Sequence, residues 1–364
     1  MALAIVLVLM VVGSVVFHFW SPWWLTPLAS NWGAMDDTIM ITFWVTGFVF
    51  IAVNLFIAYC VVKFRHSPGR KSAYEPENNK LESWLTILTA IGVFVMLAPG
   101  LVVYTDFIRV PKDAVIIEAV GQQWQWSYRY PGKDGALGKA DNRHVTFENP
   151  LGIDPDDPWG EDDVVVVGAP AHIELDQPIK FNLRSKDVLH DFYVPQFRAK
   201  MDLVPGLVSY FWMTPTVAGT YEVMCAELCG VGHYNMRSSI VVDKKADYRK
   251  WLSKQTTFAQ SQGREALGGD PVERGLLLTQ QNGCIACHSL DGRSGVGPTW
   301  KGMYGSTGTL TDGTTTVADD AYLVESITNP GAKIREGYAP LMAAYPFSED
   351  DLEAILAYFI TLSE

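Results

Sequence analysis

Three long apolar stretches lie in the first 106 residues of the chain. Residues 1–20, 38–62 and 83–105 contain no Lys, Arg, Asp or Glu. A helix of about 20 residues, rising about 1.5 Å per residue, spans the ~30 Å hydrocarbon core of a membrane. We therefore expect residues 1–106 to form three transmembrane helices. The first stretch could instead be a cleaved signal peptide, but it lacks the basic residues that precede the apolar part of one.

Beyond the apolar stretches, short runs rich in β-branched and aromatic residues alternate with Gly, Pro and Asp up to residue 243. This pattern predicts an antiparallel sandwich or barrel over residues 107–243. Residues 244–269 are polar, and we expect a short helix followed by a linker. After them, Asp270 and Pro271 are typical of a helix start, and the last helix has its apolar residues at helical spacing. These are Leu352, Ile355, Leu356 and Phe359.

The distribution of charged residues indicates how the chain is oriented in the membrane, and the net charge argues against one class of partner. The loop 63–71 between two apolar stretches contains two Lys and two Arg. By the positive-inside rule this loop lies in the cytoplasm, so the chain after residue 105 lies outside. The net charge of −12 argues against nucleic acid, because phosphate binding needs clustered Lys and Arg, and it suits a basic protein partner.

The most informative residues lie in one loop between predicted strands. It contains Cys225, Cys229, His233 and Met236, and His190 lies upstream. Thiolate and imidazole ligands suit copper, with a thioether as a weak axial ligand. Two thiolates can bridge two copper ions, with one imidazole for each ion. A disulfide would leave the histidines and the methionine unexplained, and zinc rarely takes methionine.

A second motif, Cys284-Ile-Ala-Cys287-His288, has the spacing that attaches c-type haem. The two thiols add to the haem vinyl groups, and the histidine binds the iron. A thioredoxin-like pair or half a zinc site is the alternative, but neither requires a histidine directly after the second cysteine. Methionine often completes the iron coordination, and Met303 and Met342 both follow the motif.

The copper loop, the β-rich region and the two preceding apolar stretches resemble subunit II of haem–copper cytochrome c oxidases over residues 38–242. The C-terminal region resembles a class I cytochrome c, a fusion similar to the caa type of oxidase. This resemblance implies N-terminal transmembrane α-helices, an all-β cupredoxin sandwich and an all-α cytochrome c domain. It also implies a bacterial inner membrane, with the copper and haem domains on the periplasmic side.

The resemblance implies a role for each residue of the copper loop. The Glu227 side chain would reach a Mg ion at the interface with subunit I. In the binuclear centre, called CuA, Cys225 and Cys229 would bridge the two copper ions. His190 and His233 would ligate one ion each. Met236 would bind one ion, and the backbone carbonyl of Glu227 would bind the other.

Three more residues are assigned by resemblance. Trp124 lies in an aromatic run similar to the patch where electrons enter, although alternating aromatics alone are more typical of a strand in a core. Glu82 resembles an acid that opens a proton path into subunit I, but its segment lacks the proline of the usual pattern. Without the resemblance, Glu82 is a favourable charge at a helix start. Met342 lies in a segment similar to the methionine loop of cytochromes c, with Ala343 in place of proline. Pro298 resembles the proline whose carbonyl orients the haem histidine.

We therefore expect electrons to pass from cytochrome c, or from a quinol–cytochrome c oxidoreducing complex, through haem c and CuA to subunit I. Oxygen would be reduced to water there, by a proton-translocating oxidoreductase of the respiratory chain. The alternatives are the CuA subunit of a nitric oxide reductase and a membrane-tethered electron carrier. Glu82 and Trp124 favour the oxidase, and Glu227 argues against a free carrier.

An acidic loop, residues 154–163, has six carboxylates in ten residues. It could be a solvated loop, a docking surface for a basic cytochrome or for the linker, or a calcium site.

Overall fold

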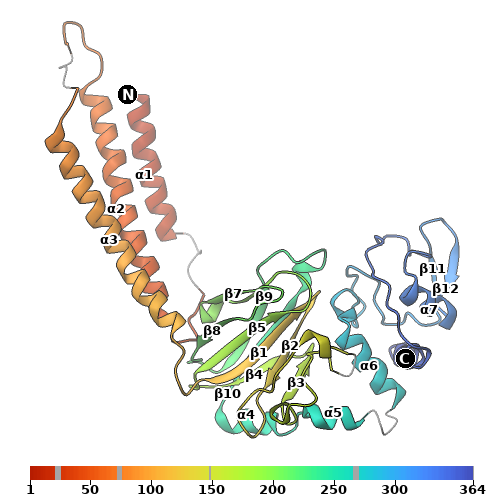
Figure 1. Ribbon diagram of the computed structural model, residues 1–364. Coiled ribbons are helices and arrows are strands. Elements are labelled where there is room, and N and C mark those ends of the chain that lie inside the picture. The colour runs from red at the N-terminus through yellow and green to blue at the C-terminus, as the bar shows by residue number, and fades with distance from the viewer. Residues whose placement is uncertain (21–25, 72–75, 147–148, 265–269, 364) are drawn as a thin grey trace. The chain divides into compact units, whose positions relative to one another are not determined.

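The computed structural model describes residues 1–364 except for 21–25, 72–75, 147–148, 265–269 and 364 (Figure 1). The described residues form two compact units, Met1–Val110 and Pro111–Glu364.

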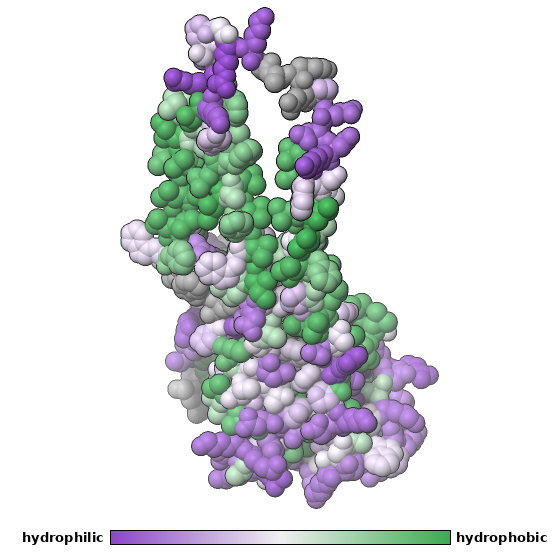
Figure 2. All heavy atoms as spheres, turned by 90° about the vertical axis from the view of Figure 1, so that its left-hand side faces the viewer, coloured by the Kyte–Doolittle hydropathy of each residue, from purple (hydrophilic) through white to green (hydrophobic). Residues whose placement is uncertain are grey.

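The first unit consists of α1 (Ala2–Trp20), α2 (Gly33–Lys63) and α3 (Asn79–Ile108). Each of these three helices is long and apolar enough to cross a membrane, as expected. Apolar side chains, green in Figure 2, cover their surfaces, and Phe48 and Phe94 are each at least 70% exposed. Lipid is the environment in which such a surface is favourable. Both α2 and α3 extend beyond the charge-free stretches, because polar residues at their ends continue the helices.

The second unit begins with a sandwich of two five-stranded sheets. The first sheet has the strand order β3-β2-β1-β5-β8, and the second has the order β4-β10-β9-β6-β7 (Figure 1). Both sheets are mixed rather than purely antiparallel, because β1 pairs with β5 and β4 with β10 in parallel. The strands are β1 (Val115–Gln122), β2 (Gln125–Tyr130), β3 (Val164–Val167), β4 (Ala171–Glu174), β5 (Ile179–Ser185), β6 (His190–Val194), β7 (Ala199–Leu203), β8 (Ser209–Met213), β9 (Gly219–Cys225) and β10 (Arg237–Asp243).

The core of the sandwich follows from the alternation of side chains along its strands. Buried and half-buried residues alternate along the whole of β5. Phe181 on β5 stacks on Phe192 and on Phe211, with ring centroids 5.6 and 5.2 Å apart. Phe192 in turn is opposite Cys225 in the antiparallel pairing of β6 with β9. This packing fixes the end of β9 beside the start of β6, where His190 lies.

The acidic loop is tied to the sandwich by its own carboxylates. Asp163 is fully buried and accepts hydrogen bonds from Arg129 at 3.0 Å and from the backbone of Gly138 at 3.1 Å. Asp157 and Asp162 accept from backbone N–H groups of the facing segment 133–139. These contacts give the loop a structural role. Among the described residues, no candidate metal cluster includes this loop.

Arg129 is the centre of a buried ion network. It lies 2.9 Å from Glu118 and 3.0 Å from Asp163, and Arg184 lies 2.7 Å from the other oxygen of Glu118. Burial by itself raises the pKa of Glu118, but the two guanidinium groups outweigh burial and lower it. Glu118 therefore remains charged within the sandwich.

Much of the segment expected as a linker is folded against the sandwich. It forms α4 (Lys245–Leu252) and α5 (Phe258–Arg264). Trp251 stacks on His172 with ring centroids 4.3 Å apart, and Phe258 is buried in a small apolar cluster. The Phe258 N–H also donates to the carbonyl of Asp163 at 2.7 Å. Residues 265–269 of the expected linker lie outside the described residues.

The C-terminal domain contains α6 (Pro271–Gln281), α7 (Asp320–Thr328) and α8 (Glu349–Thr361). Asp270 caps α6 as expected, and Ser348 and Asp351 form a capping box at α8. Gly275 allows α6 and α8 to cross closely, because a Cβ there would lie 2.0 Å from the carbonyl oxygen of Ala354. A hairpin of β11 (Thr307–Thr309) and β12 (Thr315–Val317) was not expected in this helical domain.

Candidate copper and haem centres

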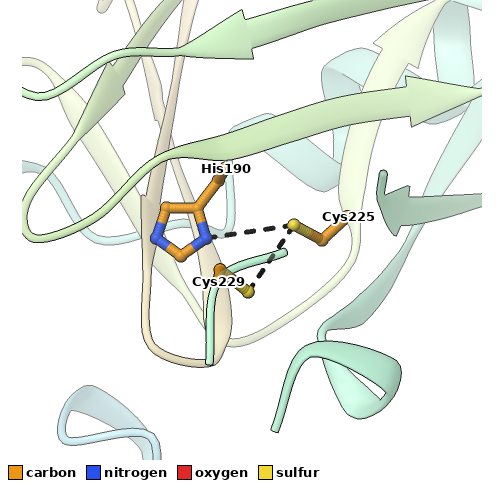
Figure 3. A group of neighbouring side chains, drawn as sticks. All are labelled: His190, Cys225 and Cys229. Atoms are coloured by element: carbon orange, nitrogen blue, oxygen red, sulfur yellow. Dashed lines mark hydrogen bonds between the residues drawn. The ribbon is translucent and has the colours of Figure 1, made fainter. Parts of the chain in front are cut away.

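Three of the predicted copper ligands meet inside the sandwich. The side chains of His190, Cys225 and Cys229 point toward one another (Figure 3). The Cys225 Sγ lies 3.9 Å from His190 Nδ1 and 3.7 Å from Cys229 Sγ. His190 is completely buried, and each cysteine is at most 9% exposed. Their ligand atoms lie within 4.8 Å of one another, close enough for a common metal centre.

The other predicted ligands surround the same point. His233, on the short 3-10 helix His233–Asn235, places its Nδ1 3.5 Å from the Cys229 Sγ. The Met236 Sδ lies 3.8 Å from the same sulfur, and the carbonyl oxygen of Glu227 lies 3.1 Å from the Cys225 Sγ. The structure thus brings together two thiols, two imidazoles, one thioether and one carbonyl. This donor set fits copper.

The two cysteines are free thiols and do not form a disulfide. Their 3.7 Å separation is far longer than the ~2.05 Å of a sulfur–sulfur bond. Burial opposes ionisation of Cys225, but hydrogen bonds from His190 and the neighbouring backbone outweigh it and lower its pKa to about 6. Burial and the charge of Cys225 raise the pKa of Cys229 to about 12. A second thiolate is therefore costly without a cation, and bound metal supplies the compensating charge.

Asp187 orients the His190 ring. Its Oδ1 lies 2.8 Å from His190 Nε2, which leaves Nδ1 facing the sulfur atoms. Burial alone lowers the pKa of His190, but Asp187 and Cys225 outweigh burial and raise it. A carboxylate on the far nitrogen is the usual means of fixing a metal-binding imidazole. Asp187 had no predicted role, although the Asp-x-x-His spacing of Asp187 and His190 is a sequence signal for one.

Trp124 contacts the copper loop instead of the sandwich core. Its Nε1 donates to the carbonyl of Cys229 at 3.0 Å. The indole lies against Gly232, where a Cβ would be only 2.4 Å from the ring, so only glycine fits. Trp126, two residues later, is buried in the core, and Trp124 remains half-buried.

The C-x-x-C-H motif borders a cavity of about 290 Å³. Cys284, Cys287 and His288 line it, and Trp124 of the copper domain lines it as well. The His288 Nδ1 lies 2.8 Å from the carbonyl oxygen of Pro298, as expected, and the ring stacks on Trp300 at 5.0 Å. Burial lowers the pKa of His288, which favours the neutral imidazole that binds iron.

The two candidate methionines differ in their surroundings. Met303 is 8% exposed and belongs to the apolar core of the C-terminal domain. Met342 is 39% exposed, and both methionines line the cavity. The two differ in packing: Met303 is held in the core, whereas the partly exposed Met342 has more freedom to move toward an iron in the cavity. The thiols, the imidazole and the aromatic lining fit a covalently attached haem.

Two protein families match the parts of the chain that carry these centres. Residues 115–244 match "Cytochrome C oxidase subunit II, periplasmic domain", and residues 272–363 match "Cytochrome c". The alternative cytochrome c oxidase subunit 2 of Bradyrhizobium diazoefficiens is 58% identical over 267 residues, which are 73% of this chain and 96% of that protein. This chain belongs to the cytochrome c oxidase subunit II family.

Further similar proteins have lower sequence identity to this chain. Cytochrome c oxidase subunit 2 of Alkalihalophilus pseudofirmus is 25% identical over 344 residues, covering 90% of this chain and 86% of that protein. The solved periplasmic domain of subunit II of cytochrome oxidase (CoxB) of Bradyrhizobium japonicum is 27% identical, at a TM-score of 0.30. The match covers 40% of this chain and 95% of the solved chain.

Membership of the subunit II family indicates where this chain works and in which process. The chain is a membrane-anchored subunit of a haem–copper oxidase complex with a periplasmic domain, and it takes part in electron transfer. Its two domains imply CuA copper and haem c. The described residues place Glu82 in the exposed first turn of α3, in the membrane unit, and the Glu227 side chain is half-buried.

Proposed function

We propose that this subunit receives electrons from a donor and passes them to subunit I of a membrane terminal oxidase, which reduces oxygen to water. When bound, haem c and CuA supply the redox chemistry, and the chain holds both groups in one compact unit. The observation that carries the proposal is the position of Trp124. It donates a hydrogen bond to the copper loop and also lines the haem cavity.

The copper ligands would act as the family resemblance implies. Cys225 and Cys229 would hold the two ions with their thiolates, and β9 and β10 on either side of the loop would keep their sulfurs close together. Because the site is buried and its ligands are already close together, the protein reorganises little when the charge on the centre changes. The remaining ligands are His190, His233, Met236 and the carbonyl of Glu227.

The haem would be attached by Cys284 and Cys287 and ligated by His288 and Met342. Gly297 allows His288 to lie close to the backbone, since a Cβ there would be 2.6 Å from the ring. The Pro298 carbonyl holds the ring by its Nδ1, which leaves Nε2 for iron.

The other roles concern protons, magnesium and the membrane. Glu82 would open a proton path into subunit I, since it is a carboxylate at the edge of an apolar helix. The Glu227 carboxylate would bind Mg at the interface with subunit I. The three apolar helices would cross a bacterial inner membrane, with the copper and haem domains in the periplasm.

The charge of the cytochrome c domain indicates the kind of donor. Residues 270–364 contain 13 acidic and 5 basic residues, a net charge of −8. A donor with a basic surface would be attracted to it, and the attraction would weaken with salt. A soluble cytochrome c or a quinol–cytochrome c oxidoreducing complex with such a surface fits this role.

Metal analysis and electron paramagnetic resonance of the matured full-length chain test the proposal. We expect two coppers for each haem, with hyperfine structure from one electron shared equally by two copper nuclei. A copper-free or single-copper spectrum beside an intact haem would contradict it. The chain would then be a membrane-anchored cytochrome.

A further inference from the structure

Three uncharged side chains of the copper domain donate hydrogen bonds to backbone carbonyls of the cytochrome c domain. Gln122 and Gln125 both donate from Nε2 to the carbonyl of Gln281, at 3.0 and 2.9 Å. Asn235 donates from Nδ2 to the carbonyl of Ala286. We call these three residues the amide surface.

The two acceptor carbonyls lie on the segment that carries the haem motif. Gln281 is the last residue of α6, and the final carbonyls of a helix lack partners within it. Its carbonyl has two lone pairs, so it can accept from two amides at once. Ala286 lies between the two cysteines of the C-x-x-C-H motif. The amide surface therefore holds the cytochrome c domain at the end of α6 and within its haem-attachment motif.

A glycine lets the two backbones approach each other between these contacts. Gly283 precedes the first haem cysteine and has a φ of +68°, in the left-handed region that favours glycine. A Cβ at this position would lie 3.3 Å from the carbonyl oxygen of Gln123, next to Trp124. The contact thus centres on Trp124.

Charge does not account for this contact. Residues 107–243 contain 19 acidic and 12 basic residues, and residues 270–364 contain 13 and 5, so both domains are acidic. Coulomb repulsion between them opposes docking. Close ion pairs such as Arg129 with Glu118 in the copper domain and Arg274 with Asp351 in the cytochrome c domain join residues of the same domain.

We propose that Gln122, Gln125 and Asn235 are positioning residues that dock the chain's own cytochrome c domain on Trp124 through neutral hydrogen bonds, so that docking does not depend on attraction between charges. This inference rests on the proposed function. It separates two steps by their chemistry: an external donor is recruited by charge, and the internal contact is held by amides. The internal contact therefore persists at salt concentrations that weaken recruitment.

A triple variant, Gln122→Glu, Gln125→Glu and Asn235→Asp, tests the proposal. Each change keeps the shape of the side chain but replaces the donating NH2 group with a carboxylate oxygen that faces a carbonyl. Gln122→Glu also keeps the oxygen that accepts from Lys186 at 2.7 Å. The control variant adds the same three negative charges away from the contact, at Asn142→Asp, Gln255→Glu and Gln260→Glu.

Hydrogen exchange of the full-length, matured chain measures docking directly, through the peptides covering residues 121–126 and 279–288. In the wild type we expect protection at about 1 M salt to be at least as high as at about 0.01 M, because the shorter Debye length, about 3 Å instead of about 30 Å, screens the repulsion between the two acidic domains. In the triple variant, exchange of these peptides should be at least about tenfold faster, because three hydrogen bonds are lost. The control should match the wild type. Loss of wild-type protection at high salt, or wild-type protection in the triple variant, would overturn the proposal.

Spectra and electron-transfer rates separate this proposal from the proposed function. The copper resonance and the haem spectrum should be unchanged in the triple variant, while the rate of electron transfer between the two centres falls at least about tenfold. If both centres are present and the rate is unchanged, only the docking proposal fails. If the binuclear copper signal is missing from the wild type, the proposed function itself fails.

Discussion

The copper centre lies within a complete β-sandwich, whereas the haem centre is a cavity of a small helical domain that Trp124 of the copper domain also lines. At the copper centre, the sulfur and nitrogen atoms named above lie 3.5 to 3.9 Å apart, and His190 is completely buried. At the haem centre, a cavity of about 290 Å³ is open, and Met342 at its edge is 39% exposed.

This difference follows from the size of each cofactor. Metal ions fit between side chains that the sandwich core already holds in place, so the core is closed without them. A haem is as large as several side chains, and the cavity walls include Trp300, Ile355 and Phe359 from the apolar core of the domain. A bound haem would thus complete the core of its domain, whereas the core of the sandwich is closed without copper.

Removing haem should therefore destabilise its domain, whereas removing copper should leave the sandwich folded. In a Cys284→Ser, Cys287→Ser, His288→Ala variant, we expect α6 and α8 to lose protection from hydrogen exchange, because the haem completes their core. In a Cys225→Ser, Cys229→Ser variant, copper is lost but the strands of the sandwich keep their protection. If α6 and α8 stay protected without haem, or if the sandwich unfolds without copper, this difference between the two domains is contradicted.

The buried ion network gives the largest single-residue effect expected in the sandwich. Arg129→Met leaves Asp163 buried without its guanidinium partner, which should lower the free energy of unfolding by about 3–5 kcal/mol. Denaturant unfolding, followed by a spectroscopic signal of the copper domain, measures the change in the free energy of unfolding. The copper and haem spectra of the folded variant should be unaltered. Arg143→Met, which removes the exposed pair with Asp141, should show no measurable change. A small effect at Arg129 would mean that the network does not stabilise the fold.

Asp187→Asn tests whether the carboxylate tunes the copper site. We expect copper affinity to fall by about 10–100-fold, because His190 loses the charged partner that fixes its ring. Competition with a copper chelator measures the affinity. Asp243→Asn breaks a similar carboxylate–imidazole contact at His172, 2.6 Å long, and serves as the matched control. Equal copper affinity in both variants would contradict the role of Asp187.

Met342→Ala should have the smallest effect on stability and a clear effect on haem ligation. Because Met342 is partly exposed, we expect the free energy of unfolding to change by less than about 1 kcal/mol. The absorption band from methionine–iron coordination should disappear, and the haem potential should fall. Met303→Ala should do the reverse, keeping the band and costing about 2–5 kcal/mol. Loss of the band in Met303→Ala alone would assign the sixth ligand to Met303.

The parts of this molecule that were predictable from sequence are those encoded by short spacings. Charge-free runs predicted the three helices, because helix length and membrane thickness are fixed quantities. Four of the candidate copper-binding side chains were predictable because they share one loop, which also supplies the carbonyl of Glu227, and His190 is the one candidate from a distant strand. The C-x-x-C-H motif is similarly local, as is the capping box at Ser348.

The remaining features depend on contacts between distant segments. The parallel pairing of β1 with β5 cannot be deduced from alternation within either strand. The folded part of the expected linker depends on Trp251 and Phe258, two aromatic residues whose partners lie far away in sequence. Gln122 and Gln125 have no local pattern at all, because their acceptor is a backbone carbonyl more than 150 residues later.

Rapid photoreduction of haem c in the full-length subunit, assembled in its oxidase, shows directly whether haem c passes its electrons to CuA. We expect the reduced haem signal to decay together with the rise of reduced CuA, at a rate independent of protein concentration. A reduced haem that persists, or whose decay accelerates with concentration, would show that its electrons leave to another molecule. The two centres of this chain would then not form one electron path.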